Sequence, residues 1–392
     1  MSTTAERPLR VLLVSHYYPP HLGGIEMVVR QEAVRLAAAG AEVTVVTSAG
    51  RGGVVEQDGV RVVRVAAWNG VERRTGVPFP LLSPVLLPTL LRWTRWADVV
   101  HLHDCLYLTS WAAGLAAPLT RTPYLLTQHV GLVQHPSAPV RLVQRAVYAT
   151  AGRLLLRRAR RVFTLNGSVA AFVRGLGTRP ERSHHLPNGV DLRLFHPADT
   201  STEREHTRAR FGLPRQGTLV LFAGRLVPKK GYQLLLDAAA GADYQLVLAG
   251  EGDTRPLADR TGVHHLGGLA PEELAQVYRA CDVFALPSTA EGFPLTVQEA
   301  MASGLPVVTT DDPGYAPYRL DPSQALLIPR QTAALRSALD DLAGDPGRRA
   351  DMGAAARRCA EARFAWETHV DQLLSHYRNA LTASATVPAE AG

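Results

Sequence analysis

The chain has 392 residues, 46% of them hydrophobic and 20% charged, which is ordinary for a soluble globular protein and long enough for two domains. Its three cysteines are odd in number and far apart, which argues against a disulfide framework or a cysteine zinc site and favours a reduced, cytoplasmic protein. The charge is uneven: up to Pro180 there are 21 arginines against nine acidic residues, a net +12 within a total of +7.

The first half of the chain alternates predicted strands and helices. The apolar run at residues 10–15 predicts a buried strand, and a glycine loop follows it. The next segment predicts a helix with Ile25, Val28, Val29 and Leu36 on one face, ended by Gly40. Further strands are predicted at residues 42–48, 60–65, 98–102, 124–127 and 161–165, with helical segments between them.

The second half repeats this alternation. Strands are predicted at residues 218–223, near Tyr244, His264 and Val283, and at residues 305–309. Two such series predict an α/β protein with two Rossmann-like domains built on parallel sheets and a cleft between them. We expect an N-terminal domain at residues 1–190, a C-terminal domain at 191–365, and a final helix and tail at 366–392 that returns to the N-terminal domain.

No predicted segment spans a membrane. The apolar run at residues 11–14 is too short for a signal peptide, and the run at 81–91 is interrupted by Pro84 and Pro88. The basic first half could meet an anionic membrane or an acidic substrate, or it could be a solvated arginine-rich face. It has no nucleic-acid-binding motif, so we expect no nucleic acid partner. The densest arginine cluster, at residues 153–161, predicts peripheral contact with the inner face of the membrane.

Residues 291–304 carry the most specific pattern. Pro294 suits the first turn of a helix and Gly304 suits its end, so a helix is expected from about 294 to 303. Backbone N–H groups near Gly292, Phe293 and Leu295 would receive phosphates at the positive end of this helix, where Pro294 has no N–H to leave unsatisfied. Glu299 would reach back to a ribose diol, while Glu291 would face a sugar. The alternative is a capping acid and a solvated Glu299.

A second cluster of charge follows the strand near Thr218. Gly224 turns the chain, so that Arg225 and Lys230 can contact a diphosphate. The guanidinium of Arg225 would donate two parallel hydrogen bonds, and the ammonium of Lys230 would contribute a single positive charge. Lys229, the only other lysine, is more simply a solvated side chain. Gly23 and Gly24 at the start of the first helix would form the corresponding phosphate-binding turn in the other domain. Two adjacent glycines are as often only a tight turn.

Several polar residues stand at the ends of predicted strands. His103 and Asp104 follow one strand and His129 follows the next, so both groups are expected at the same edge of the sheet. Together with His16 in the first loop, His103 and Asp104 are candidate acceptor-binding residues. No His-x-x-x-His or Asp-x-Asp spacing is present, and we therefore expect no divalent metal and no further cofactor.

Together these segments resemble the retaining GT-B glycosyltransferases of family 4. The resemblance covers nearly the whole chain and rests on Gly23-Gly24-Ile25-Glu26, His101-Leu102-His103-Asp104, Thr127-Gln128-His129, Leu186-Pro187-Asn188-Gly189-Val190-Asp191, Gly224-Arg225-Leu226 with Lys230-Gly231, Gly250-Glu251-Gly252, and the segment from Glu291 to Glu299. Pro294 departs from the glycine that many relatives carry.

The resemblance implies that the C-terminal domain binds a nucleoside diphosphate sugar. Arg225 and Lys230 would then contact the diphosphate and Glu299 the ribose, with Glu251 and Gly252 beside the base. It also implies that Gly24 lets the first loop approach the diphosphate and that His129 and Glu291 lie near the reacting sugar.

We therefore predict a glycosyltransferase that moves a hexosyl unit, from a UDP-linked donor, to a hydroxyl of a small molecule, a glycan or a lipid-linked acceptor with retention of configuration. His129, Glu291, Arg225 and Lys230 are the predicted catalytic residues. The alternatives are a nucleotide-sugar epimerase or phosphorylase on the same fold and a noncatalytic surface-binding module. A dehydrogenase is disfavoured, because no Gly-x-Gly-x-x-Gly follows the first strand.

Overall fold

The computed structural model describes residues 7–21, 23–68, 81–132, 137–289 and 292–385. The chain divides into two compact units. The N-terminal unit comprises Met1–Leu186 and His369–Gly392, and the C-terminal unit comprises Pro187–Thr368. The sequence analysis placed these boundaries at 190/191 and 365/366, within a few residues of the division in the structure.

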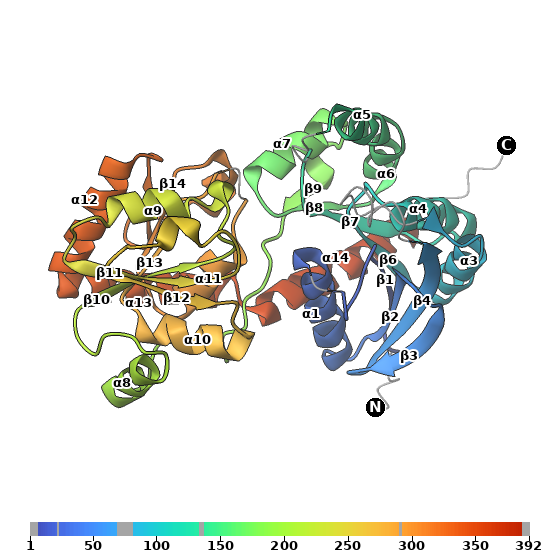
Figure 1. Ribbon diagram of the computed structural model, residues 1–392. Helices are drawn as coiled ribbons and strands as arrows, with labels where there is room; N and C mark the ends of the chain where they lie inside the picture. The colour runs from blue at the N-terminus through green and yellow to red at the C-terminus, as the bar shows by residue number, and fades with distance from the viewer. Residues whose placement is uncertain (1–6, 22, 69–80, 133–136, 290–291, 386–392) are drawn as a thin grey trace, which may run out of the picture. The chain divides into compact units, whose positions relative to one another are not determined.

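The N-terminal unit is built on a sheet whose strand order is β3-β4-β2-β1-β6-β7-β8-β9, with β5 paired to β4 (Figure 1). From β4 to β9 along this order, neighbouring strands are parallel. The strands are β1 (Arg10–Val14), β2 (Glu42–Ala49), β3 (Gly53–Gln57), β4 (Val60–Trp68), β5 (Leu81–Leu82), β6 (Val99–His103), β7 (Tyr124–Gln128), β8 (Val162–Thr164) and β9 (Ser183–His185).

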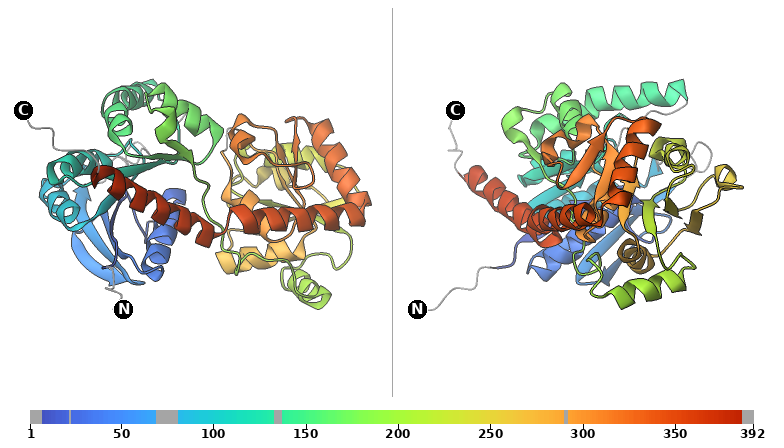
Figure 2. Two further views of the ribbon diagram at one scale, coloured as in Figure 1. Left: turned by 180° about the vertical axis from the view of Figure 1, so that it is seen from behind. Right: turned by 90° about the vertical axis from the view of Figure 1, so that its left-hand side faces the viewer.

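The helices of this unit cover both faces of its sheet. They are α1 (Gly24–Ala38), α3 (Leu86–Trp96), α4 (Leu108–Thr120), α5 (Ala138–Val147), α6 (Arg153–Arg158), α7 (Gly167–Gly175) and, from the end of the chain, α14 (Trp366–Ala385). Figure 2 shows α14 lying along the sheet of this unit. Its side chains Val370, Leu373 and Tyr377 share one buried core with Val11 and Leu13 of β1, which confirms that the last helix returns to the N-terminal domain.

The sequence analysis missed two antiparallel pairings at one edge of this sheet. β3 pairs with β4 through a hairpin in which Asp58 and Gly59 both have positive φ, 54° and 75°. Such a pair favours the tight turn that joins antiparallel strands. All five residues of β3 are exposed, so the period-of-two burial that marks a strand is absent there. The short β5 also pairs antiparallel to β4.

The C-terminal unit has a six-stranded parallel sheet of order β12-β11-β10-β13-β14-β15. Helices α9 and α12 cover one face, and α10 and α11 the other (Figure 1). The strands are β10 (Thr218–Ala223), β11 (Tyr244–Ala249), β12 (Val263–Gly267), β13 (Val283–Leu286), β14 (Val307–Thr310) and β15 (Ala325–Ile328); the helices are α8 (Ser201–Arg210), α9 (Tyr232–Ala238), α10 (Pro271–Ala280), α11 (Leu295–Ala302), α12 (Thr332–Gly344) and α13 (Pro346–Arg363).

The two parallel-sheet units confirm the predicted fold class. The first helix buries Val28, Val29 and Leu36 as expected, and Gly40 follows its end with φ of 89°. Every predicted strand is present, and the one at Thr218–Ala223 has the predicted bounds. The chain adds β11 and β12 on one side of β10 and then adds β13, β14 and β15 on its other side. The carboxyl ends of β11, β10 and β13 therefore lie side by side at the centre of the sheet, the position where open α/β sheets bind ligands.

Candidate active site

The predicted donor-binding residues of the C-terminal unit that the structure describes lie on strand-end loops at one edge of its sheet and on helix α11 beside them. The loop after β10 and the loop after β11 are joined backbone to backbone: the N–H of Leu226 donates to the carbonyl of Glu251 at 2.8 Å. The approach requires glycine, because a Cβ on Gly250 would lie 2.0 Å from the carbonyl oxygen of Gly224 and one on Gly252 would lie 2.5 Å from that of Leu226. The Gly-Arg-Leu and Gly-Glu-Gly motifs are therefore one structural element.

The loop after β13 joins the same element. The N–H of Thr289 donates to the carbonyl of Lys229 at 2.9 Å. Gly231, with φ of 77°, lies so close to Pro287 that a Cβ would be 2.0 Å from its carbonyl oxygen. The guanidinium of Arg330, a residue the sequence analysis missed, donates to the carbonyls of Pro287 at 3.2 Å and Pro228 at 3.4 Å. Three strand-end loops are thus held as one rigid rim.

Arg225 and Lys230 both stand on this rim. Arg225 is exposed, and Lys230 is partly buried, at the end of a 3-10 turn (Pro228–Lys230). The Lys230 side chain passes over Gly224, with its Cδ and Cε each 3.9 Å from where a Cβ of that glycine would be. Lys229 beside it is exposed. The two predicted cations therefore come from the same loop and lie at the carboxyl edge of β10.

Helix α11 begins next to this rim. Pro294 is its N-cap residue and the helix runs over Leu295–Ala302, followed by Gly304 with φ of 72°, as the sequence predicts. Phe293 is buried and stacks on Tyr318 at 3.9 Å between ring centroids. Its side chain thus anchors the helix start to the core, which leaves only its backbone for a ligand. Gly292 is partly buried, and Glu291 lies outside the described residues.

Glu299, on the second turn of α11, is only partly accessible. Its Oε2 lies 3.1 Å from the hydroxyl of Tyr278 on α10, which also lies 3.0 Å from the carbonyl of Thr296. Burial raises the pKa of Glu299 to about 7, against which the Tyr278 hydrogen bond lowers it. Its protonation state therefore changes near neutral pH. The sequence analysis missed Tyr278, the group that holds this carboxyl in place.

Glu251 is exposed, and its carboxylate is directed back along the loop. Its Oε1 accepts a hydrogen bond from the N–H of Gly268 at 2.9 Å. The ring of His265 reaches the carbonyl of Gly250 at 2.9 Å from the neighbouring strand β12. These contacts fix the loop that the sequence analysis assigns to the base pocket.

In the N-terminal unit, Gly23 and Gly24 precede and begin α1, and they differ in what surrounds them. A Cβ on Gly23 would lie 2.2 Å from the carboxylate of Glu26, which folds back over the helix start and pairs with His21 at 3.4 Å. A Cβ on Gly24 would meet no described atom within 4 Å. Packing explains the first glycine, whereas the second leaves open space at a helix N-terminus.

The strand-end histidines do come together. His129 Nε2 lies 3.1 Å from His103 Nδ1, and the two rings stack with centroids 5.4 Å apart. His129 is 7% exposed and His103 is fully buried behind it. Burial lowers the pKa of His129 to about 3 and that of His103 well below its usual value, so both rings are neutral near pH 7. A neutral His129 can exchange hydrogen bonds with a hydroxyl but carries no charge.

Asp104 and His16 are also buried in the N-terminal unit. Asp104 has φ of 69° and accepts hydrogen bonds from the Gln128 amide at 2.9 Å and from the N–H of Leu106 at 3.1 Å. Burial raises its pKa to about 6. The His16 ring stacks on Tyr107 with centroids 4.0 Å apart. Both residues shape the loops at this edge of the sheet, and their contact with an acceptor stays a prediction.

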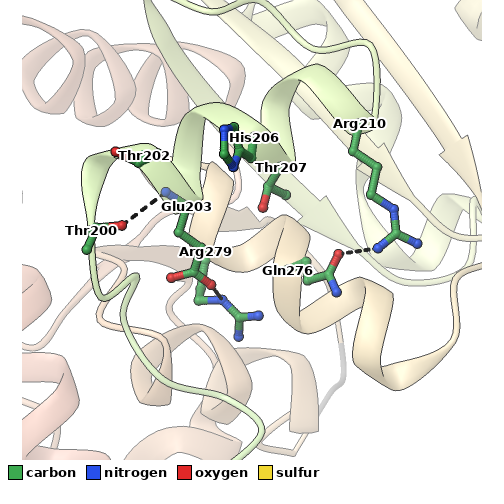
Figure 3. A pocket seen from close by; sticks show the side chains of 8 residues that line it. All are labelled: Thr200, Thr202, Glu203, His206, Thr207, Arg210, Gln276 and Arg279. Carbon is green, nitrogen blue, oxygen red and sulfur yellow. Dashed lines mark hydrogen bonds and ion pairs between the residues drawn. The ribbon is translucent and has the colours of Figure 1, made fainter.

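A pocket of about 480 Å³ lies elsewhere in the C-terminal unit, between α8 and α10. Figure 3 shows that its polar groups are engaged with one another: Arg279 pairs with Glu203 at 2.7 Å, and Arg210 donates to Gln276 at 2.7 Å. None of its lining residues is among the predicted site residues. We assign it no part in the reaction.

Comparison with known proteins identifies the family of the chain. Residues 203–359 match the model of the glycosyl transferases group 1, and residues 23–189 match that of the glycosyl transferase 4-like domain. A D-inositol 3-phosphate glycosyltransferase of Xylanimonas cellulosilytica is 32% identical over 394 residues, which cover 91% of this chain and 92% of that protein. The chain belongs to the family 4 glycosyltransferases. A second relative of this glycosyltransferase, D-inositol 3-phosphate glycosyltransferase 1 of Catenulispora acidiphila, is 33% identical over 92% of the chain and 91% of its own length.

Solved structures share the GT-B fold with this glycosyltransferase. Sucrose-phosphate synthase from Thermosynechococcus elongatus superimposes with a TM-score of 0.72 at 25% identity, over 96% of this chain and 100% of the other. Anabaena Alr3699/HepE in complex with UDP gives a TM-score of 0.74 at 20% identity, over 95% of this chain and 100% of the other.

Proposed function

We propose that this glycosyltransferase moves a hexosyl unit from a UDP-linked sugar to an acceptor hydroxyl with retention of anomeric configuration. The observation that carries the proposal is the rigid rim of the C-terminal unit. Three interlocked strand-end loops present Arg225 and Lys230 at the carboxyl edge of β10, next to the start of α11. A diphosphate needs such a convergence of fixed positive charge and helix N–H groups.

The same groups suit the stabilisation of a leaving diphosphate. Negative charge builds up on the bridging oxygen as the glycosidic bond breaks, and preorganised cations stabilise that charge without reorganisation. We favour front-face attack, in which a diphosphate oxygen accepts the proton of the incoming hydroxyl.

His129 and Gly24 extend the proposal to the N-terminal unit. Neutral His129 is held by His103 and would exchange a hydrogen bond with a hydroxyl of the donor sugar. The open space at Gly24 suits close approach of a diphosphate to the start of α1. Glu291, near the donor sugar, completes the proposed set. Cationic side chains take the role of a divalent ion at the diphosphate, so added Mg²⁺ or Mn²⁺ should not raise the rate.

The relatives suggest where to begin the search for the acceptor. Proteins that are 32% and 33% identical carry the name D-inositol 3-phosphate glycosyltransferase. An anionic acceptor of this kind would suit the arginine-rich first half of the chain. D-inositol 3-phosphate is therefore the first acceptor to test, ahead of neutral sugars and lipid-linked glycans.

A two-step experiment tests the proposal. Thermal-shift screening against UDP, GDP and ADP sugars should reveal stabilisation by a UDP sugar. NMR of the product formed with the best donor should then show a new glycosidic bond with the anomeric configuration of the donor. An inverted product would refute retention, and a product formed without any acceptor would favour an epimerase or phosphorylase instead.

We also propose that the N-terminal unit contacts a membrane surface. Among the described helices, none is long and apolar enough to cross a bilayer. However, α5 leaves Leu142 68% and Val143 59% exposed, and Leu154 on α6 is 43% exposed beside exposed arginines. Apolar side chains flanked by arginines suit peripheral contact with anionic lipid.

A further inference from the structure

A buried cluster of ionisable side chains lies behind His129 in the N-terminal unit. Glu32 comes from α1, His101 and His103 from β6, and His369 from α14. Because His101 and His103 are two residues apart on one strand, they project from the same face of the sheet. Glu32 is 1% exposed and both β6 histidines are fully buried.

Three atoms of this cluster are spaced as ligands of one small ion. Glu32 Oε2 and His103 Nε2 are 3.4 Å apart, and neither makes a hydrogen bond to another described residue. His101 Nδ1 lies 3.9 Å from the same Glu32 oxygen, and one ligand atom from each of the three side chains lies within 4.8 Å of the others. Ligands bound tetrahedrally at about 2.0–2.1 Å are separated by about 3.4 Å. The pair of Glu32 and His103 already has this separation, and His101 would move closer to complete a set of one carboxylate oxygen and two imidazole nitrogens.

The other polar atom of each of these three side chains is already held by a partner. Glu32 Oε1 lies 3.0 Å from His369 Nε2, His103 Nδ1 lies 3.1 Å from His129 Nε2, and His101 Nε2 lies 2.7 Å from Thr127 Oγ1. Metal ligands are commonly oriented by such outer contacts, which fix the ring. They leave Glu32 Oε2 and His103 Nε2 without another hydrogen bond to the described residues, whereas His101 Nδ1 is hydrogen-bonded to the Tyr377 hydroxyl at 2.7 Å. The cluster therefore has both a ligand set and its supports.

The charge of the cluster also favours a bound cation. Among the described residues, the ion pairs of Glu32 are with histidines, and none is with arginine or lysine. A buried carboxylate is costly unless positive charge compensates it. A cation bound beside Glu32 would compensate this carboxylate.

We propose that Glu32, His101 and His103 bind a divalent transition metal ion, and that zinc is the ion that this nitrogen and oxygen ligand set suits. Binding forms three coordinate bonds and breaks the 2.7 Å hydrogen bond between His101 Nδ1 and the Tyr377 hydroxyl, with no change of oxidation state. The three proposed ligands belong to the N-terminal unit, whereas Arg225 and Lys230, the cations proposed to bind the diphosphate, belong to the C-terminal unit.

The bound ion would have a structural role. It would join α1 to β6 directly, and it would hold α14 through the hydrogen bond between Glu32 and His369. Metal binding of this kind adds its free energy to that of folding. The expected readout is therefore metal content and thermal stability, both of which can be measured without any substrate.

The test refolds the full chain from urea with zinc chloride or with EDTA, because the site is closed to solvent in the folded protein. After desalting, mass spectrometry of the metal should find one zinc ion per wild-type chain. At zinc concentrations about 100-fold above the dissociation constant, the melting temperature should rise by ~5–10 °C. Glu32→Gln, which keeps the size of the side chain, should retain neither effect, and Tyr377→Phe should keep both.

A control on the same helix separates this site from adventitious zinc. His376→Asn removes an α14 imidazole that lies against His184, with ring centroids 4.9 Å apart, and should keep the full zinc content. If Glu32→Gln fails to fold, His103→Asn and the visible spectrum of cobalt-loaded wild type replace it. Equal zinc in wild type and in the Glu32 or His103 variants would overturn the proposal. The proposal would also be overturned if wild type refolds to its native state without zinc and NMR then finds a protonated histidine ring that neutralises Glu32.

Discussion

Replacement of Lys230 by alanine tests the proposed donor site, and the chain supplies its own control. Lys229 and Lys230 are the only lysines in the sequence and are neighbours in one turn. Lys230 is partly buried and passes over Gly224 at the end of β10, whereas Lys229 is exposed. Both variants remove the same charge from the same loop. Only Lys230→Ala removes a cation that is fixed at the strand end.

The expected loss follows from the kind of contact that is removed. A hydrogen bond to a charged group contributes about 1.5–3 kcal/mol, which corresponds to a roughly 10- to 150-fold change in rate. Charge on the diphosphate grows as it departs, so most of the loss should appear in kcat rather than in KM. Lys229→Ala should change kcat/KM by no more than about twofold, as is usual for a charge on an exposed side chain.

The assay measures initial rates with the donor and acceptor found by the screen, for wild type and for both variants. Circular dichroism and thermal melting establish that each variant is folded. The reasoning would be refuted by Lys230→Ala with a kcat/KM within about twofold of that of Lys229→Ala. Arg225→Ala provides a second test, because it removes the other proposed cation and should also cost one to two orders of magnitude.

Three further predictions concern particular residues. The pKa of Glu299 is raised from 4.5 to about 7, so between these pH values the folded unit keeps a proton that the unfolded chain loses. The free energy of unfolding should therefore fall by up to about 3 kcal/mol as the pH rises from 4.5 to 7. Urea unfolding of Glu299→Gln should show no such fall. Gly250→Ala should destabilise the C-terminal unit by ~2–5 kcal/mol, because its Cβ would lie 2.0 Å from a carbonyl oxygen. Gly241→Ala is also at positive φ but has open space around it, so it should cost only ~1–2 kcal/mol. Equal urea midpoints for the two variants would contradict the prediction. Co-sedimentation with phosphatidylglycerol vesicles at low salt should detect the wild type, and the double variant Leu142→Ser with Val143→Ser should bind more weakly; no binding by the wild type would remove the proposed membrane contact.

Much of the fold could be predicted because parallel strands buried on both faces give long apolar runs. The strand Thr218–Ala223 and the helix that begins after Pro294 have such unambiguous local signals. The strand Gly53–Gln57 has none, since it is exposed throughout and its pairing depends on the Asp58-Gly59 turn. The short strand Ser183–His185 was missed because three partly buried residues show no period.

Less of the candidate site could be predicted, because its geometry depends on contacts between segments far apart in sequence. The glycines of Gly250-Glu251-Gly252 are visible as a motif, but only the structure shows that they let this loop lie against the one after β10. Tyr278 is separated from Glu299 by 21 positions, and Arg330 from Pro228 by 102, so no local pattern connects either pair. His-x-His on a strand was a readable signal for the buried cluster, but its partner Glu32 lies on a helix far upstream.

The return of α14 affects the order in which the protein can mature. The face of β1 that carries Val11 and Leu13 is covered by residues at the far end of the chain, among them Leu373 and Tyr377. During synthesis on the ribosome, the first unit therefore cannot close its apolar core until residues 370–380 have been translated, by which point the whole of the second unit, Pro187–Thr368, has been translated as well. The N-terminal domain should thus not mature first, as domains usually do during synthesis. A nascent chain that stops short of residue 370 should expose this surface to chaperones and proteases.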